Sequence, residues 1–276
     1  MTPGPGAVRS HLRTALKFAC VLGVLYFLFA AYVRSKKARK LKWSPIESTA
    51  EAFTALTRAL LGLSVTTTSA LEYRDVLSLT PNAEDSATCC AVVVISRDWD
   101  NGSSLAPRPK RPSDPIFMKQ TIANSCGSIA CLHVLANSEP LWRAAHPTSE
   151  LDGTLRELRS SSSADDAGGT FAADSRIATC HAAVAGQRRA GGRGRGEGGG
   201  GGGAVATRSF HYVTFVCVDG TIWELDSLAP APINRGACAP NELLGEVLQV
   251  ARAKAAVKGG KERLALLSVH VVAKLL

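Results

Sequence analysis

The chain has 276 residues, 46% of them hydrophobic and 20% charged, which is enough to bury a sizeable core. Its net charge of +9 comes from residues 1–42, which hold nine Lys or Arg and no Asp or Glu, so that 23 basic and 23 acidic residues remain elsewhere. Because the remainder is neutral, the basic balance does not indicate a nucleic-acid-binding protein, and we exclude nucleic acid as a partner.

An apolar run of sixteen residues, 18–33, lies between basic residues near the start of the chain. As a helix it would span about 24 Å, less than the ~30 Å hydrocarbon core, so Lys17 and Arg34 would have to reach the lipid headgroups. The denser positive charge follows the run, which predicts a membrane anchor with the rest of the chain in the cytosol. A cleaved signal peptide, an organellar targeting sequence and an extension from a wrongly assigned gene start remain alternatives.

A continuous apolar run at residues 90–95 predicts a buried strand. After it, residues 117–137 change from a polar turn to an apolar run with helical spacing, and Asn124 or Ser125 is expected to cap the helix. Cys126 then lies in the first turn, where unpaired backbone amides favour the thiolate that attacks carbonyl groups. Cys126 is therefore a candidate nucleophile, although a buried structural cysteine is more common at such a position.

The next part of the chain has a composition that cannot form a core. Residues 159–170 are polar and poor in helix-forming residues, and residues 191–203 contain ten glycines. We expect a flexible glycine-rich insertion at about residues 182–207.

Residues 210–226 predict two strands joined by a two-residue turn at Asp219 and Gly220. In that register His211 lies diagonal to Asp226, roughly 7 Å away at the backbone, so that an imidazole and a carboxylate can meet. The carboxylate would orient the imidazole and stabilise its protonated form, while the second ring nitrogen takes a proton from a thiol.

A histidine and aspartate on a hairpin are usually structural, but here they accompany Cys126 and Gln120, which lies six residues before the cysteine. Together they would supply a nucleophile, a base, an orienting group and an oxyanion donor. A helical pattern at residues 241–257 and a strand pattern at residues 264–272 complete the chain. We expect an α+β domain over residues 43–276, a mostly antiparallel sheet flanked by helices, with the N-terminal hydrophobic helix outside it.

These motifs resemble the ubiquitin carboxyl-terminal hydrolases, a family of cysteine proteases with a papain-like arrangement. Residues 120–128 reproduce the family's QTIxNSCGT-like segment with serine in the last place. The histidine-to-aspartate spacing of fifteen, the Val-Asp-Gly turn and the PxPIN stretch at residues 230–234 also resemble the family pattern. Residues 43–48 and 73–76 are similar to its earlier landmarks, so the resemblance covers roughly residue 43 to the C-terminus.

The resemblance implies a papain-like fold and a deubiquitinase that cleaves after the C-terminal glycine of ubiquitin through a thioester. It implies that Cys126 is the nucleophile, His211 the base and acid, Asp226 the orienting group and Gln120 the oxyanion-hole donor. Ubiquitin and its adducts are the implied partners, with no cofactor and no metal, and we expect a monomer. An inactive membrane-tethered ubiquitin-binding module and a hydrolase for a ubiquitin-like modifier are the alternatives.

Three departures from the family pattern concern the substrate and leave the reaction unchanged. The glycine-rich insertion lengthens the loop that crosses over the active site in the family, and we hypothesise that it admits bulkier leaving groups. Ser227 and Arg235 stand where relatives more often carry glycine and histidine.

The eight cysteines contain no C-x-x-C pair, which indicates reduced thiols in a cytosolic protein. Cys180 and His181 are adjacent, which is not a usual spacing for zinc ligands.

Overall fold

The computed structural model describes residues 42–64, 67–78, 80–97, 99, 110–186, 210–257 and 264–272. By its internal contacts the chain divides into residues 1–41 and 42–276. The predicted hydrophobic helix at residues 18–33 lies outside the described residues. Among the helices in the described ranges, none has both the length and the apolar character that crossing a bilayer requires.

A six-stranded sheet with the order β1-β6-β2-β3-β4-β5 forms the centre of the fold, and each neighbouring pair of strands is antiparallel. This confirms the expected α+β architecture. The predicted strand at 90–95 becomes a central strand whose core valines are fully buried, because both faces of the sheet are covered. The strands are β1 Leu71–Asp75, β2 Cys89–Ser96, β3 His211–Val218, β4 Thr221–Asp226, β5 Ile233–Ala237 and β6 Ala265–Val271.

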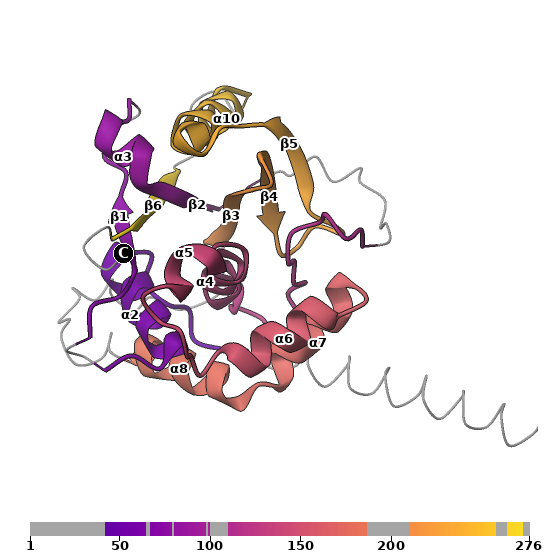
Figure 1. The fold of residues 1–276 in the computed structure, drawn as a ribbon. Coiled ribbons are helices and arrows are strands. Elements are labelled where there is room, and N and C mark those ends of the chain that lie inside the picture. Colours follow the sequence, from indigo (N-terminus) through magenta and orange to yellow (C-terminus); the bar gives the residue numbers. More distant parts are fainter. Residues whose placement is uncertain are drawn as a thin grey trace, which may run out of the picture. The chain divides into compact units, whose positions relative to one another are not determined.

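Alternate residues of β2 belong to two separate cores, as the two-residue period of a strand requires. Val92 and Val94 face the helix α10, whereas Val93 and Ile95 face a larger core beneath the other helices. Figure 1 shows α10 on one side of the sheet and α4 with α2 and α8 on the other. The helices are α2 Ala50–Leu61, α3 Ala83–Thr88, α4 Cys126–Asn137, α5 Glu139–Arg143, α6 Asp152–Ser160, α7 Ala164–Ala173, α8 Ser175–Gly186, the 3-10 helix η1 Pro240–Glu242 and α10 Leu243–Val257.

Helix α4 begins at Cys126, as the sequence predicts, but its start is not capped in the expected way. Ser125 occupies the N-cap position, yet its hydroxyl donates to the carbonyl oxygen of Ile122 at 2.8 Å. The Asn124 side chain donates to the carbonyl oxygen of Trp43 at 2.8 Å. Both side chains therefore act as donors that fix the turn before the helix, and neither accepts a hydrogen bond from a helical amide.

Residues 159–170, which are poor in helix-forming residues, contain most of a helix with buried residues, so the expectation that this segment cannot form a core is wrong. Helix α7 begins after Ser163, whose hydroxyl accepts from the amide of Asp166 at 3.1 Å. Two acidic residues in its first turn favour the helix start as well. Helix α8 extends to Gly186, so the predicted start of the insertion at about residue 182 lies inside a helix.

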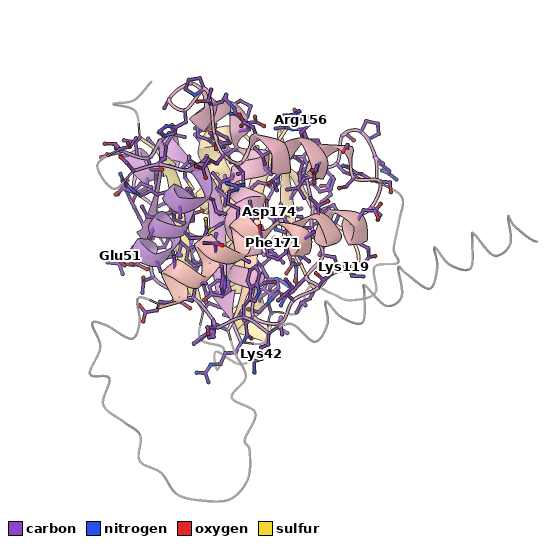
Figure 2. The ribbon with its side chains drawn as sticks, turned by 90° about the horizontal axis from the view of Figure 1, so that it is seen from below. Lys42, Glu51, Lys119, Arg156, Phe171 and Asp174 are labelled. Atoms are coloured by element: carbon purple, nitrogen blue, oxygen red, sulfur yellow. The ribbon has the colours of Figure 1, made fainter. Side chains whose placement is uncertain are left out.

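Helices α6 to α8 are joined by buried contacts on the lower side of the sheet, where Figure 2 labels Phe171 and Asp174. Phe171 is fully buried, with its ring centroid 5.5 Å from that of Trp43. The carboxylate of Asp174 accepts from the first amides of α8 and from the hydroxyl of Thr154 at 2.6 Å. This residue therefore fixes α8 against α6.

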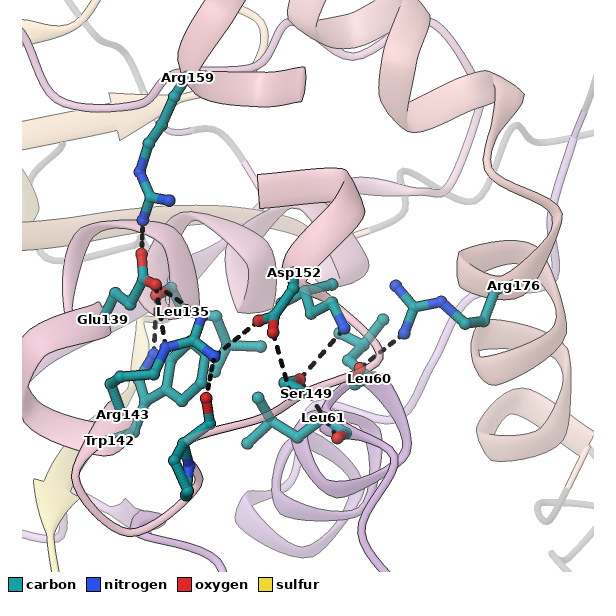
Figure 3. Close-up of polar contacts among 12 residues, drawn as sticks. Leu60, Leu61, Leu135, Glu139, Trp142, Arg143, Ser149, Asp152, Arg159 and Arg176 are labelled. Atoms are coloured by element: carbon teal, nitrogen blue, oxygen red, sulfur yellow. Dashed lines mark hydrogen bonds and ion pairs between the residues drawn. The ribbon is translucent and has the colours of Figure 1, made fainter. Parts of the chain in front are cut away.

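An ion-pair network joins α5 to α6 (Figure 3). Arg143 pairs with Glu139 and with Asp152, each at 2.6 Å, and Arg159 pairs with the second oxygen of Glu139. Burial opposes the charge of Asp152, but the hydrogen bond from Arg143 outweighs it and holds the pKa of this carboxyl below its usual value. The network orients the helices that follow α4.

Candidate active site

The cysteine singled out by the sequence is the first residue of α4, a helix that packs against β3, which is an interior strand of the sheet. Asn124, two residues earlier, has a φ of 66°, a left-handed conformation that asparagine tolerates better than most residues. This turn directs the chain into α4 at Cys126. The thiol of Cys126 donates to the carbonyl oxygen of Phe210 at 3.8 Å, which places it beside the residue that precedes His211.

The β3–β4 hairpin has the register that the sequence predicts. Val218 is paired with Thr221, and the turn residues Asp219 and Gly220 have φ values of 50° and 69°. Positive φ at both positions is the requirement of a type I′ turn. With this register, Val213 is opposite Asp226, and His211 lies two residues further along the ladder.

The imidazole and the carboxylate meet as expected. Nε2 of His211 donates to Oδ1 of Asp226 at 2.6 Å, and the carboxylate side chain is 2% exposed. The amide of Leu228 donates to the same oxygen at 2.8 Å, which fixes the carboxylate. Since Nε2 is engaged, Nδ1 is the ring nitrogen left for the thiol.

The charge state of His211 follows from these contacts. Burial alone would lower the pKa of the imidazole, but the hydrogen bond that it donates to Asp226 and the interaction with Cys126 outweigh this effect and raise the pKa to about 9. A protonated imidazole beside a thiol is the electrostatic environment that favours a thiolate.

Gln120 is held in place by three contacts. Its backbone amide donates to the carbonyl oxygen of Ser227 at 2.9 Å, and its side-chain Oε1 accepts from the hydroxyl of Ser227 at 3.3 Å. Its side-chain Nε2 donates to the carbonyl oxygen of Ile122 at 2.9 Å. An amide nitrogen has two hydrogens, so this orientation leaves one hydrogen for another acceptor. Ser227, where the family more often has glycine, therefore fixes Gln120 directly.

Arg235, the third departure from the family pattern, compensates a buried charge. Glu224 is fully buried on β4, two residues before Asp226 and on the same face of the strand. Its two carboxylate oxygens accept from Nε1 of Trp99 at 2.8 Å and from Nε of Arg235 at 2.7 Å. The sequence analysis missed this group, because nothing in a single sequence indicates that positions 99, 224 and 235 meet.

A cleft of about 440 Å³ opens beside Cys126. Three parts of the chain line it: residues 45–49, the start of α4 through Asn124 and Cys126, and the start of β3 through Phe210 and Tyr212. The sequence analysis did not assign a role to residues 45–49 or to Tyr212. The position of Tyr212 directly after His211 was the available signal.

The other titratable groups near the core do not fit a role in proton transfer or metal binding. Burial lowers the pKa of His133 to about 3, and its Nε2 accepts from the amide of Met118 at 3.0 Å. Burial raises the pKa of the Cys90 and Cys131 thiols to about 12. His181 lies between the hydroxyl of Ser128 and a backbone carbonyl. In the described ranges, no cluster of three or more His, Cys, Asp or Glu could hold a metal ion.

About half of the chain is similar in sequence to known ubiquitin hydrolases. It is 33% identical over 141 residues to ubiquitin carboxyl-terminal hydrolase isozyme L1 of Sus scrofa, and 35% identical over 138 residues to the isozyme of Homo sapiens. Each alignment covers 49% of this chain and 55% of the relative. The chain thus spans about half the length of the curated relatives that it matches.

Solved structures have the same fold. The catalytic domain of UCH37 from Trichinella spiralis, bound to ubiquitin vinyl methyl ester, superimposes with a TM-score of 0.64 at 21% identity, covering 87% of this chain and 99% of that one. A second UCH37 structure with the same ligand has a TM-score of 0.59 at 22% identity, with 84% of each chain covered. The model of ubiquitin carboxyl-terminal hydrolase family 1 matches residues 43–256, and the chain therefore belongs to this family.

Proposed function

We propose that this protein is a thiol-dependent deubiquitinase that hydrolyses bonds at the C-terminal glycine of ubiquitin. Membership of the family supports the substrate class, since relatives carry the name of ubiquitin hydrolases and the two UCH37 structures contain a ubiquitin ester. The observation that supports the chemistry most is the hydrogen bond between His211 and the buried Asp226. It lies close to the first residue of α4, Cys126, whose thiol contacts the residue before His211.

The proposed reaction uses the side chains of Cys126, His211 and Gln120 in turn. Transfer of the thiol proton of Cys126 to Nδ1 of His211 gives a thiolate and an imidazolium, the charge state that the raised pKa of His211 favours, and the thiolate attacks the carbonyl carbon of the terminal glycine. The side-chain amide of Gln120 donates to the oxyanion that forms. His211 then returns the proton to the departing amine, which leaves a thioester on Cys126. Water, deprotonated by His211, attacks this thioester and releases the ubiquitin carboxylate and the thiol.

Asp226 has a distinct part in this sequence. Its carboxylate holds Nε2 of His211, so that Nδ1 is directed to the thiol, and it stabilises the imidazolium between the two proton transfers. The raised pKa of His211 is the expression of this stabilisation.

Turnover of ubiquitin that carries a fluorescent amine on its C-terminal glycine tests the proposal. We expect the parent to release the amine and Cys126→Ala to release none, because no thioester can form. Gln120→Ala should retain activity reduced by about 10²- to 10³-fold, the usual cost of one lost oxyanion donor. A Cys131→Ala variant is the matched control, since this cysteine is in the same helix but fully buried. A folded parent without turnover, or a Cys126→Ala variant with parental turnover, would contradict the proposal.

A further inference from the structure

The leading segment, residues 43–49, is fixed at both ends beside the cleft. At its start, the amide of Trp43 donates to the carbonyl oxygen of Ala123 at 3.0 Å, and Asn124 donates to the carbonyl oxygen of Trp43. At its end, the hydroxyl of Thr49 accepts from the amide of Ala52 and so caps helix α2. The residues between these ends line the cleft beside Cys126.

The middle of the leading segment lies directly against the first turn of α4. Ile46 is 3% exposed, and a Cβ added at Gly127 would come within 2.4 Å of its Cδ1 atom. Because Gly127 follows Cys126, any displacement of the leading segment changes the space next to the thiol. The position of this segment therefore sets the shape of the cleft at the reacting atom.

A hydrogen bond connects the leading segment to the strand that carries His211. Oγ of Ser48 lies 2.6 Å from the phenol oxygen of Tyr212, a separation of 164 residues in sequence. The phenol donates to the carbonyl oxygen of Ile46 at 3.3 Å, so the Ser48 hydroxyl supplies the proton of the shorter bond. Two successive polar contacts thus tie the leading segment to one phenol oxygen.

Tyr212 is a rigid partner for this contact. It is 5% exposed, and its ring centroid lies 5.3 Å from that of Phe53 in α2. Since successive residues of a strand face opposite sides, its ring lies on the other face of β3 from His211. The phenol can therefore fix the cleft without touching the imidazole.

We propose that Ser48 and Tyr212 are positioning residues. They hold the leading segment in the place that makes the cleft wide enough for an extended peptide C-terminus to reach Cys126. The identification of a peptide C-terminus as the group that occupies the cleft rests on the proposed hydrolase function. The pair acts on substrate fit, because both residues line the cleft, whereas the proton transfer uses His211 and Asp226 on the other face of the strand.

The test compares Tyr212→Phe, Ser48→Ala and the double variant in turnover of the ubiquitin amide. Each single change removes the hydrogen bond between Ser48 and Tyr212, and Tyr212→Phe also removes the bond to the carbonyl oxygen of Ile46. We expect KM to rise about three- to tenfold in each, with the larger rise in Tyr212→Phe, and kcat to stay within about twofold. The double variant should match Tyr212→Phe, because that change already removes both bonds of the phenol. Tyr73→Phe is the matched control. This buried phenol accepts a hydrogen bond from the hydroxyl of Thr57 at 3.3 Å, and it does not line the cleft.

A second readout separates this inference from the proposed function. Modification of Cys126 by two reagents is followed by mass spectrometry: iodoacetamide, and a five-residue peptide whose C-terminal glycine carries a vinyl methyl ester in place of its carboxylate. We expect the peptide-to-iodoacetamide rate ratio to fall about three- to tenfold in Tyr212→Phe and Ser48→Ala, and to stay parental in Tyr73→Phe.

The outcomes are distinct. A parent that reacts with the peptide ester but does not turn over ubiquitin refutes the proposed function, and the rate ratio still decides the role of the pair. An unchanged ratio in both single variants overturns the inference. So does an equal fall in Tyr73→Phe, or a double variant in which the two effects add.

Discussion

The charge on His211 is the residue-scale property that determines how activity should depend on pH. The pKa of this imidazole is raised to about 9 by the contact with Asp226, against the effect of burial. In the proposed reaction, the imidazolium that is present below this pH stabilises the thiolate and protonates the leaving amine. The same raised value stabilises the folded protein at pH below 6.5, and this contribution is lost as the pH rises through about 9.

Asp226→Asn is expected to move the alkaline limb of the kcat/KM profile to lower pH. The substitution keeps an oxygen acceptor for Nε2 but removes the carboxylate charge, so the pKa of His211 falls. The charge-assisted hydrogen bond becomes a neutral one, and kcat should fall by roughly 10- to 100-fold. The measurement is the kcat/KM profile between about pH 5 and 10. An alkaline limb unchanged from the parent would show that Asp226 does not determine the pKa of the His211 imidazole.

Some residue contacts follow from sequence and others do not. The meeting of His211 and Asp226 could be predicted, because a two-residue turn fixes the register of a hairpin. The anchoring of Gln120 by Ser227 and the bond between Ser48 and Tyr212 could not. Each of these joins segments whose relative placement depends on how helices pack on the sheet.

At the scale of elements, helix α7 supports the irregular segment that contains Gln120 and precedes α4. The amide of Lys119 donates to the carbonyl oxygen of Ala164 at 3.0 Å, and the hydroxyl of Thr121 donates to that of Gly168 at 3.3 Å. Gly168 is buried in this contact, and a Cβ there would come within 2.3 Å of the Lys119 carbonyl oxygen. The helix and the backbone next to Gln120 can approach only because residue 168 has no side chain.

Gly168→Ala and Gly169→Ala make a matched pair of predictions. The first forces α7 away from the Lys119 backbone and should destabilise the protein by about 1–3 kcal/mol. Gly169 is exposed, with no atom within 4 Å of an added Cβ. Gly169→Ala should therefore stabilise the helix by about 0.5–1 kcal/mol. Denaturant unfolding of both variants measures the difference. Equal stabilities would show that α7 does not press on the segment before Gln120.

The reason α7 was missed is also physical. Its interior contains two glycines and several polar residues, so helix propensity is weak over residues 159–170. The cap at Ser163, the acidic first turn and the buried Phe171 together outweigh that weakness. By contrast, α4 and α10 were predicted from their apolar patterns, and the β3–β4 hairpin from its Asp-Gly turn.

At the scale of the whole molecule, the family match begins at residue 43, immediately after the basic stretch that carries the net charge. The described part of the chain contains both cores, the cleft and every residue placed in the proposed reaction. The anchor at residues 18–33 and the effect of the glycine-rich insertion on the leaving group stay predictions. The anchor lies outside the described residues, and so does the part of the insertion that follows Gly186.

Covalent capture of the full chain by ubiquitin with a C-terminal vinyl methyl ester tests the central claim most directly. An intact mass increased by one ubiquitin on the parent, and unchanged on Cys126→Ala, is the predicted result, because the Cys126 thiol is at the start of α4 and interacts with His211. A folded parent that stays unmodified, or an adduct that persists in Cys126→Ala, would contradict it.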